Sequence, residues 1–151
     1  MDKHDLLDAS VYEGVLARIK SLSAESKPLW GKMSAAQMFA HCAEVQLVAN
    51  GKPLEGSPFM VKLIAPLIRK AVVNEKAYPH GSRTHPQYVI DGNRDFETEK
   101  TRLLEALSAF IHMDEGERAN IEHVLFGKLT REEKGWSMYK HIDHHLKQFG
   151  V

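Results

Sequence analysis

Two histidines near the end of the sequence, His141 and His145, lie four residues apart in a segment with helical periodicity. One helical turn separates them along the axis and about 40° around it, so both imidazoles can reach one metal ion. Met138 and Ile142 mark the apolar face that this pair borders, whereas His144 lies well away from it, at about 300° from His141. The spacing predicts a metal-binding pair; the alternative is two histidines at the edge of the core, hydrogen-bonded to water and carbonyl groups.

A third histidine, His41, lies in an apolar stripe of another predicted helix. Met38, Val45 and Val48 fall within about 60° of it around that helix. A single histidine in such a stripe is more often a hydrogen-bonded core residue, but here the pair in the last helix needs an inward partner. Three neutral imidazoles inside a helical bundle would leave an open position for water or substrate. We therefore predict that His41 and the pair bind one divalent transition metal ion, although the spacing does not choose among zinc, nickel, copper and iron.

The other histidines are weaker candidates. His123 precedes the last helix and could lie behind a metal ligand, and either His123 or His144 could be a fourth ligand that closes a structural site. His80 and His85 lie in a segment rich in glycine and proline, where we expect solvent exposure or a place in a lid over the site. No histidine has Asp or Glu three residues before it, which excludes the Glu-x-x-His motif of di-iron bundles.

The acidic side chains and the cysteine near these histidines do not identify a catalytic group. Glu44 lies one turn from His41, about 60° around the helix, and could orient its ring or be a solvated surface charge. Asp143 points about 200° away from His141 and is given no role. Cys42 is expected to be a small core residue rather than a ligand. The sequence therefore identifies no general base, and the catalytic residues stay unknown.

Four segments with helical periodicity must position these histidines. They span Asp8–Leu22, Ser34–Gly51, Asp95–His112 and Thr130–Phe149. The second and fourth begin with the sequence pattern of a capping box, in which a serine or threonine precedes a glutamine or glutamate by three residues. Four helices with a long crossover between the second and third predict an all-α four-helix bundle.

The crossover, residues 51–92, contains nine of the sixteen glycines and prolines. We predict a short apolar helix within it over Phe59–Val73, kinked by Pro66, and a possible strand over Gln87–Asp91. A turn is expected at Asp114–Glu117. The apolar helix should pack over the bundle or against a second subunit; the alternative is an element that lies on a membrane surface.

Length and composition limit the function further. A chain of 151 residues predicts one domain, residues 1–151. Lys and Arg number 20, as do Asp and Glu, and this balance argues against nucleic-acid binding and against a basic membrane anchor. The single cysteine is typical of a reducing compartment, and neither a signal peptide nor a membrane span is recognisable. We expect a soluble, cytoplasmic protein.

Four stretches resemble a known superfamily. They are Trp30–Ser34 (WGKMS), Gln37–Cys42 (QMFAHC), Phe126–Thr130 (FGKLT) and His141–Gly150 (HIDHHLKQFG). Together they are similar to the DinB/YfiT-like metalloenzymes, and more narrowly to a bacterial branch catalogued as a domain of unknown function. The similarity covers the second predicted helix and about the last thirty residues well, and the middle of the chain poorly.

The resemblance implies a four-helix bundle of the up-down-down-up type, with His41, His141 and His145 as metal ligands. It also implies a homodimer and an enzyme: the superfamily contains thiol-dependent S-transferases and a thiol-dependent isomerase. We therefore expect a zinc or nickel enzyme that performs thiol S-transfer or hydrolysis on a small molecule, with a low-molecular-weight thiol as a possible partner. The alternative is a non-catalytic bundle that binds a structural metal or a small ligand.

Overall fold

The computed structural model describes residues 2–151, which form seven α-helices, one short 3-10 helix and no strand. The helices are α1 (Ala9–Ser21), α2 (Ala35–Ala49), α3 (Phe59–Leu63), α4 (Ala65–Val73), η1 (Pro86–Tyr88), α5 (Phe96–His112), α6 (Glu115–Asn120) and α7 (Arg131–Gln148). The all-α prediction is confirmed, and the four long helices begin and end within two residues of their predicted bounds.

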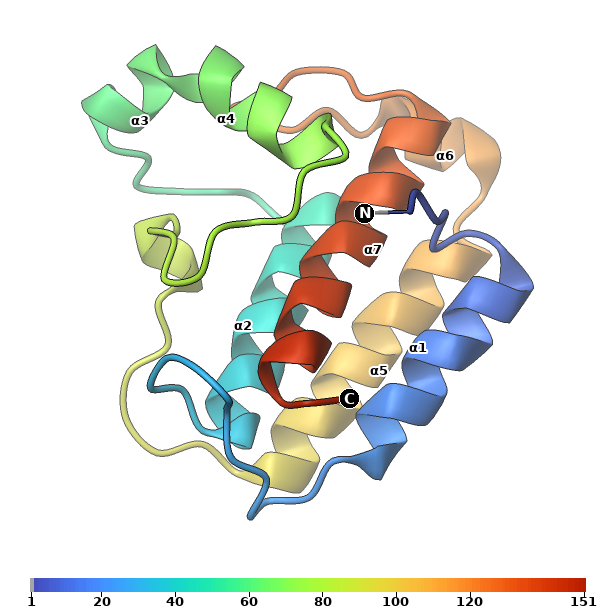
Figure 1. Ribbon diagram of the computed structural model, residues 1–151. Coiled ribbons are helices and arrows are strands. Elements are labelled where there is room, and N and C mark those ends of the chain that lie inside the picture. The colour runs from blue at the N-terminus through green and yellow to red at the C-terminus, as the bar shows by residue number, and fades with distance from the viewer. Residues whose placement is uncertain (1) are drawn as a thin grey trace.

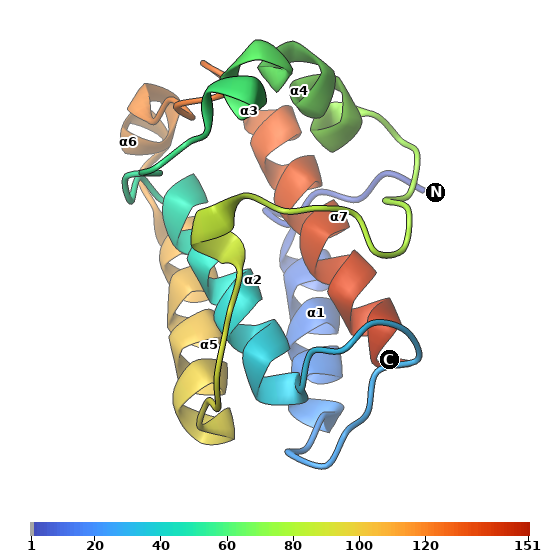
Figure 2. The ribbon, with the colours of Figure 1, turned by 90° about the vertical axis from the view of Figure 1, so that its left-hand side faces the viewer.

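The four long helices, α1, α2, α5 and α7, lie side by side (Figure 1). The short helices α3 and α4 lie across one end of them, and η1 lies alongside α2 (Figure 2). None of the helices formed by residues 2–151 is both long enough and apolar enough to span a lipid bilayer.

Capping boxes fix the starts of the two helices that carry the candidate ligands. At α2, the Ser34 hydroxyl accepts a hydrogen bond from the Gln37 backbone N–H, and the Gln37 side chain accepts one from the Ser34 N–H. Thr130 and Glu133 form the same reciprocal pair at the start of α7. Each box satisfies two backbone donors that a helix start otherwise leaves unpaired.

A hydrophobic core holds the four long helices together. Phe39 of α2, Leu107 and Phe110 of α5, and Ile142 and Leu146 of α7 are all at most 3% exposed. Ile142 and Leu146 face this core, whereas His141 and His145, each one position before them, line a cavity that the crossover covers.

The crossover differs from its prediction at Pro66. Instead of one helix with a kink, two helices, α3 and α4, meet at Ile64. Pro66 lies in the first turn of α4, where its missing N–H removes no intrahelical hydrogen bond. Proline therefore starts a helix here rather than bending one.

Two further predictions about local structure are wrong. The segment predicted as a strand, Gln87–Asp91, overlaps η1, and the Gln87 side chain ties it to the backbone of Pro53 and Glu55. The turn predicted at Asp114–Glu117 is the first turn of α6, because the Asp114 side chain accepts hydrogen bonds from the N–H groups that open this helix.

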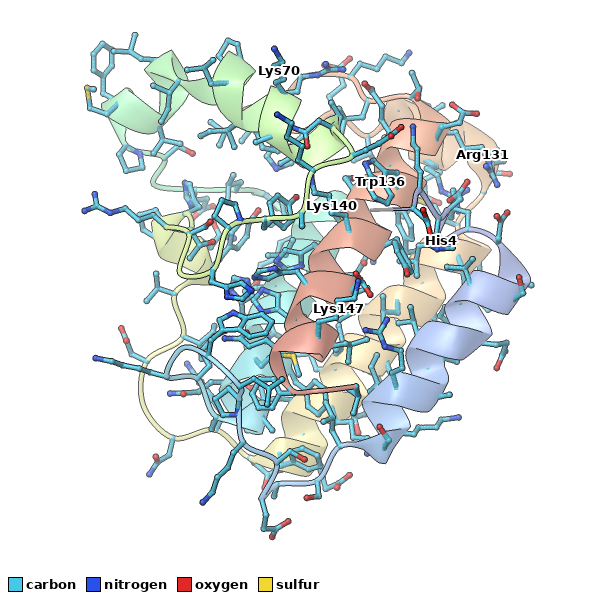
Figure 3. All side chains as sticks on the ribbon, viewed as in Figure 1. His4, Lys70, Arg131, Trp136, Lys140 and Lys147 are labelled. Atoms are coloured by element: carbon cyan, nitrogen blue, oxygen red, sulfur yellow. The ribbon has the colours of Figure 1, made fainter. Side chains whose placement is uncertain are left out.

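Helix α7 anchors the end of α4. The Trp136 indole N–H lies 3.1 Å from the carbonyl oxygens of both Val73 and Asn74. The Lys140 ammonium donates to the carbonyls of Ala71 and Asn74 at 2.7 and 2.9 Å, and both side chains extend from α7 toward this segment (Figure 3). A cation at the C-terminal end of α4 also compensates the helix dipole.

Candidate metal centre

The structure brings together the three histidines that the spacing selects. Ligand nitrogens of His41, His141 and His145 all lie within 4.8 Å of one another. The Nε2 atoms of His41 and His141 are 3.1 Å apart, and the ring centroids of His41 and His145 are 4.7 Å apart. Helix α2 supplies one ring and successive turns of α7 supply the other two, as predicted.

A backbone carbonyl orients the ring of His41. Its Nδ1 lies 2.7 Å from the carbonyl oxygen of Tyr88, in η1. A carbonyl oxygen only accepts hydrogen bonds, so Nδ1 carries the proton, and the unprotonated Nε2 directs its lone pair toward His141 Nε2. The crossover thus sets the tautomer of a residue on α2.

A chain of two hydrogen bonds orients His145 in the same way. Gln148 Nε2 donates to the carbonyl of Trp30 at 2.7 Å, which leaves its Oε1 to accept from His145 Nδ1 at 2.9 Å. His145 Nε2 is therefore also the unprotonated nitrogen. Gly31 permits this close approach: a Cβ there would lie 2.7 Å from Gln148 Nε2, and its φ of +82° favours glycine.

Replacing Gln148 by leucine should weaken metal binding about 10- to 100-fold, since losing the group that orients a histidine ligand typically costs that much. The variant leaves His145 free to rotate or to change tautomer. Competition with a chromogenic zinc chelator measures the change.

Gln46→Leu is the matched control. Gln46 is also a buried glutamine, but it lies on α2 and its side chain donates to Asn50, away from the three imidazoles. Equal zinc affinities for the Gln148 and Gln46 variants would show that Gln148 does not position His145.

Burial keeps the three imidazoles neutral. It lowers the pKa of His41 and His141, and it lowers the pKa of His145 to about 3. For His141 and His145 the neighbouring imidazoles add to the effect, because a second positive charge nearby is unfavourable. Neutral imidazole is the form that binds a metal ion.

The donor set fits a divalent transition metal. Two lone pairs are fixed by hydrogen bonds on the far sides of their rings, an arrangement common among metal-binding histidines. The 3.1 Å between the Nε2 atoms of His41 and His141 suits two ligands of one ion with bonds of about 2.0–2.1 Å. No Cys, Asp or Glu within residues 2–151 belongs to this group.

The three imidazoles line a cavity of about 910 Å³. Its wall also includes side chains of α3 and α4, the segment that contains η1, and the segment between α6 and α7. The crossover and the segment between α6 and α7 therefore cover the histidines that α2 and α7 present.

His123 and His144 also line the cavity, but neither belongs to the three-histidine group. His144 is half-buried: its ring centroid lies 5.1 Å from that of His145, and its edge packs against Trp30. The helical angle alone predicted that His144 lies well away from the core. Loop residues such as Trp30 cover that side of α7, so His144 is half-buried.

The two crossover histidines differ from each other. His85 is buried, it lines the cavity, and its Nε2 lies 3.0 Å from the Ser57 hydroxyl, which agrees with a place over the site rather than with solvent exposure. His80 is exposed, and it stacks on Trp30 with 3.8 Å between ring centroids.

The acidic residues and the cysteine lie outside the site. Glu44 pairs with Lys52 and Arg102, so it does not orient His41. Asp143 is buried and forms ion pairs with Arg18 and Lys147. Cys42 is a core residue, as expected.

Sequence reasoning missed the groups that orient the ligands: the carbonyls of Tyr88 and Trp30, and the Gln148 side chain. A signal existed for Gln148, which follows His145 by three residues and therefore shares its helix face. Backbone carbonyls have no such signal, since every residue type carries one.

Comparison with known proteins gives one match. The sequence profile of a family described as "Protein of unknown function (DUF1569)" matches residues 1–150. No curated protein matches the chain, and no solved structure matches it. These comparisons show no direct link to the DinB/YfiT superfamily.

Proposed function

We propose that this protein, which belongs to the DUF1569 family of unknown function, is a metal-dependent enzyme acting on a small molecule. In this proposal His41, His141 and His145 bind one divalent transition metal ion, zinc or nickel. One observation carries it: three buried or half-buried neutral imidazoles converge within 4.8 Å on the wall of a large cavity.

The number of ligands favours an enzyme over a structural site. Structural zinc sites are normally closed by four protein ligands, whereas catalytic sites have three and an open position. The group found in residues 2–151 has three members, and all three line the cavity. The alternative, a non-catalytic bundle with a structural metal or a bound ligand, would require a fourth ligand or a closed pocket.

A bound divalent ion would lower the pKa of a water or thiol and so supply a nucleophile at neutral pH. The protein's part is to hold the three imidazoles, to exclude bulk water with the crossover, and to accept a proton. No Asp or Glu of residues 2–151 lines the cavity. His144 lies on the same cavity wall, and burial lowers its pKa, so its imidazole is neutral at pH 7 and can accept the proton. Thiol S-transfer and hydrolysis both fit these parts.

Cobalt(II) substitution tests the proposal and separates the two reactions. If the protein is a thiol S-transferase, dithiothreitol added to cobalt-loaded protein should give a new thiolate-to-cobalt absorption band. If it is a hydrolase, the metal-loaded protein should cleave an activated ester such as p-nitrophenyl acetate, and the metal-free protein should not. Cobalt that binds without either response would favour the non-catalytic alternative.

We also propose the finer features that the sequence resemblance implies: a DinB/YfiT-like bundle of the up-down-down-up type, a homodimer and a cytoplasmic location. The side-by-side packing of α1, α2, α5 and α7 supports the first (Figure 1). The exposed apolar side chains of Phe59 and Leu63 in α3 support the second, because exposed apolar surface often marks an interface. Light scattering coupled to gel filtration measures the oligomeric state.

A further inference from the structure

The cavity beside the three histidines is walled mainly by hydrocarbon. Aliphatic and aromatic side chains from α2, from α4 and from the segment before α7 face it. Examples are Val45, Val48, Ile68, Val72, Leu125 and Phe126. Its volume of about 910 Å³ lies near the upper end of the range for small-molecule sites, roughly 300–1,000 Å³.

The interior offers no free charge to a ligand. The charged side chains that line the cavity within residues 2–151 are three cations and no carboxylate. The ammonium of Lys134 is buried and donates to the carbonyls of Arg118 and Ile121. Lys32 and Arg83 are exposed, which places them at the opening rather than inside.

The polar groups inside the cavity are neutral. His123 Nδ1 accepts a hydrogen bond from the Leu125 N–H at 3.2 Å, so its proton is on Nε2. Burial lowers the pKa of His123 to about 4, and burial raises the pKa of Tyr88, so imidazole and phenol both stay uncharged at neutral pH. These groups can donate to a carbonyl or hydroxyl oxygen, but they cannot balance a ligand charge.

We propose that the cavity binds an uncharged, largely hydrocarbon molecule whose single polar, reactive group lies at the three histidines. A charged ligand would lose its hydration in the cavity without gaining a partner of opposite charge, whereas transfer of an apolar ligand from water into the cavity is favourable. A small polar thiol alone would leave most of the wall uncovered. The placement of the reactive group rests on the proposed function; the nature of the ligand body rests on the cavity wall alone.

Two neighbouring residues of α4 supply a matched test. Ile68 lines the cavity, whereas Leu67 is 70% exposed and does not line it. Neither belongs to the hydrophobic core, so aspartate at either position should leave the fold intact. We expect the full-length protein to bind the uncharged fluorophore 1-aminoanthracene, and decanol to displace it. Ile68→Asp should weaken binding roughly ten-fold or more, and Leu67→Asp should not change it.

Val72→Trp is a second variant, which fills the cavity without adding a charge and should also weaken binding. Circular dichroism verifies that each variant is folded. Equal affinity in all the proteins, or equal losses for Ile68→Asp and Leu67→Asp, would overturn the inference, because the probe would then bind elsewhere.

Metal content of the same samples separates this inference from the proposed function. Metal without binding of 1-aminoanthracene would overturn the ligand class and leave the metal site standing. Binding of the probe with the expected pattern of losses, in a protein that takes up no metal, would support the cavity inference and contradict the metal enzyme.

Discussion

Replacing His141 and His145 together by alanine should abolish stoichiometric metal binding. Wild-type protein should hold about one divalent ion per chain, as expected for a site with three histidine ligands. The double variant has a single imidazole left, which cannot hold the ion against water and buffer. His41→Ala should have a similar effect, since it removes the ligand from α2. Elemental analysis of untagged protein measures the metal directly.

His112→Ala is the control for this experiment. It removes an imidazole at the end of α5 whose contacts are with Ser108, and it should leave the metal content unchanged. Unchanged metal content in the double variant would contradict the proposed site. No metal in wild-type protein, even after refolding with zinc and nickel, would leave three core histidines and favour the non-catalytic alternative.

Mild acid should destabilise the metal-free protein strongly. The folded pKa of His145, about 3, lies below its unfolded value near 6.5, and the pKa values of His41 and His141 are lowered too. Below pH 6.5 the unfolded chain therefore binds protons that the folded chain excludes. The free energy of unfolding that these histidines contribute is fully present above pH 6.5, and it is lost as the pH falls toward their folded pKa values. Each excluded proton costs about 1.4 kcal/mol per pH unit.

Several excluded protons would remove a large part of the 5–15 kcal/mol that typically stabilises a domain. Urea unfolding of metal-free protein at pH 7 and pH 5 measures the loss. His145→Gln should reduce the slope by about one proton, whereas His112→Ala should not change it. The same pH dependence in wild-type protein and His145→Gln would show that His145 is protonated as easily in the folded state as in the unfolded state.

The candidate ligands were predictable because their arrangement is largely local. Helical geometry alone places His141 and His145 on adjacent turns, and the apolar neighbours of His41 show that it faces inward. Their meeting across α2 and α7 follows once both apolar faces share one core. The sequence was therefore sufficient to select the three residues, although the resemblance added its own support.

The surroundings of the site were harder to predict. Glycine and proline in the crossover indicate irregular backbone, but they say nothing about burial. The sequence therefore left open whether His85 is solvent-exposed or lies in a lid, and it is buried beside Ser57. The carbonyls of Tyr88 and Trp30 act through backbone atoms and leave no mark on residue type. The apolar cavity depends on how three distant segments pack, which no local pattern encodes.

Helices α3 and α4, which lie across one end of the four long helices, should open locally more often than the rest of the fold. Ala65 is the only buried residue of these two helices, and polar contacts of Trp136, Lys140 and Arg69 connect α4 with α7. A segment with so little buried apolar surface opens at a low free-energy cost, far below that of global unfolding. Backbone amides of α3 and α4 should therefore exchange with solvent deuterium much faster than those of α2 and α5.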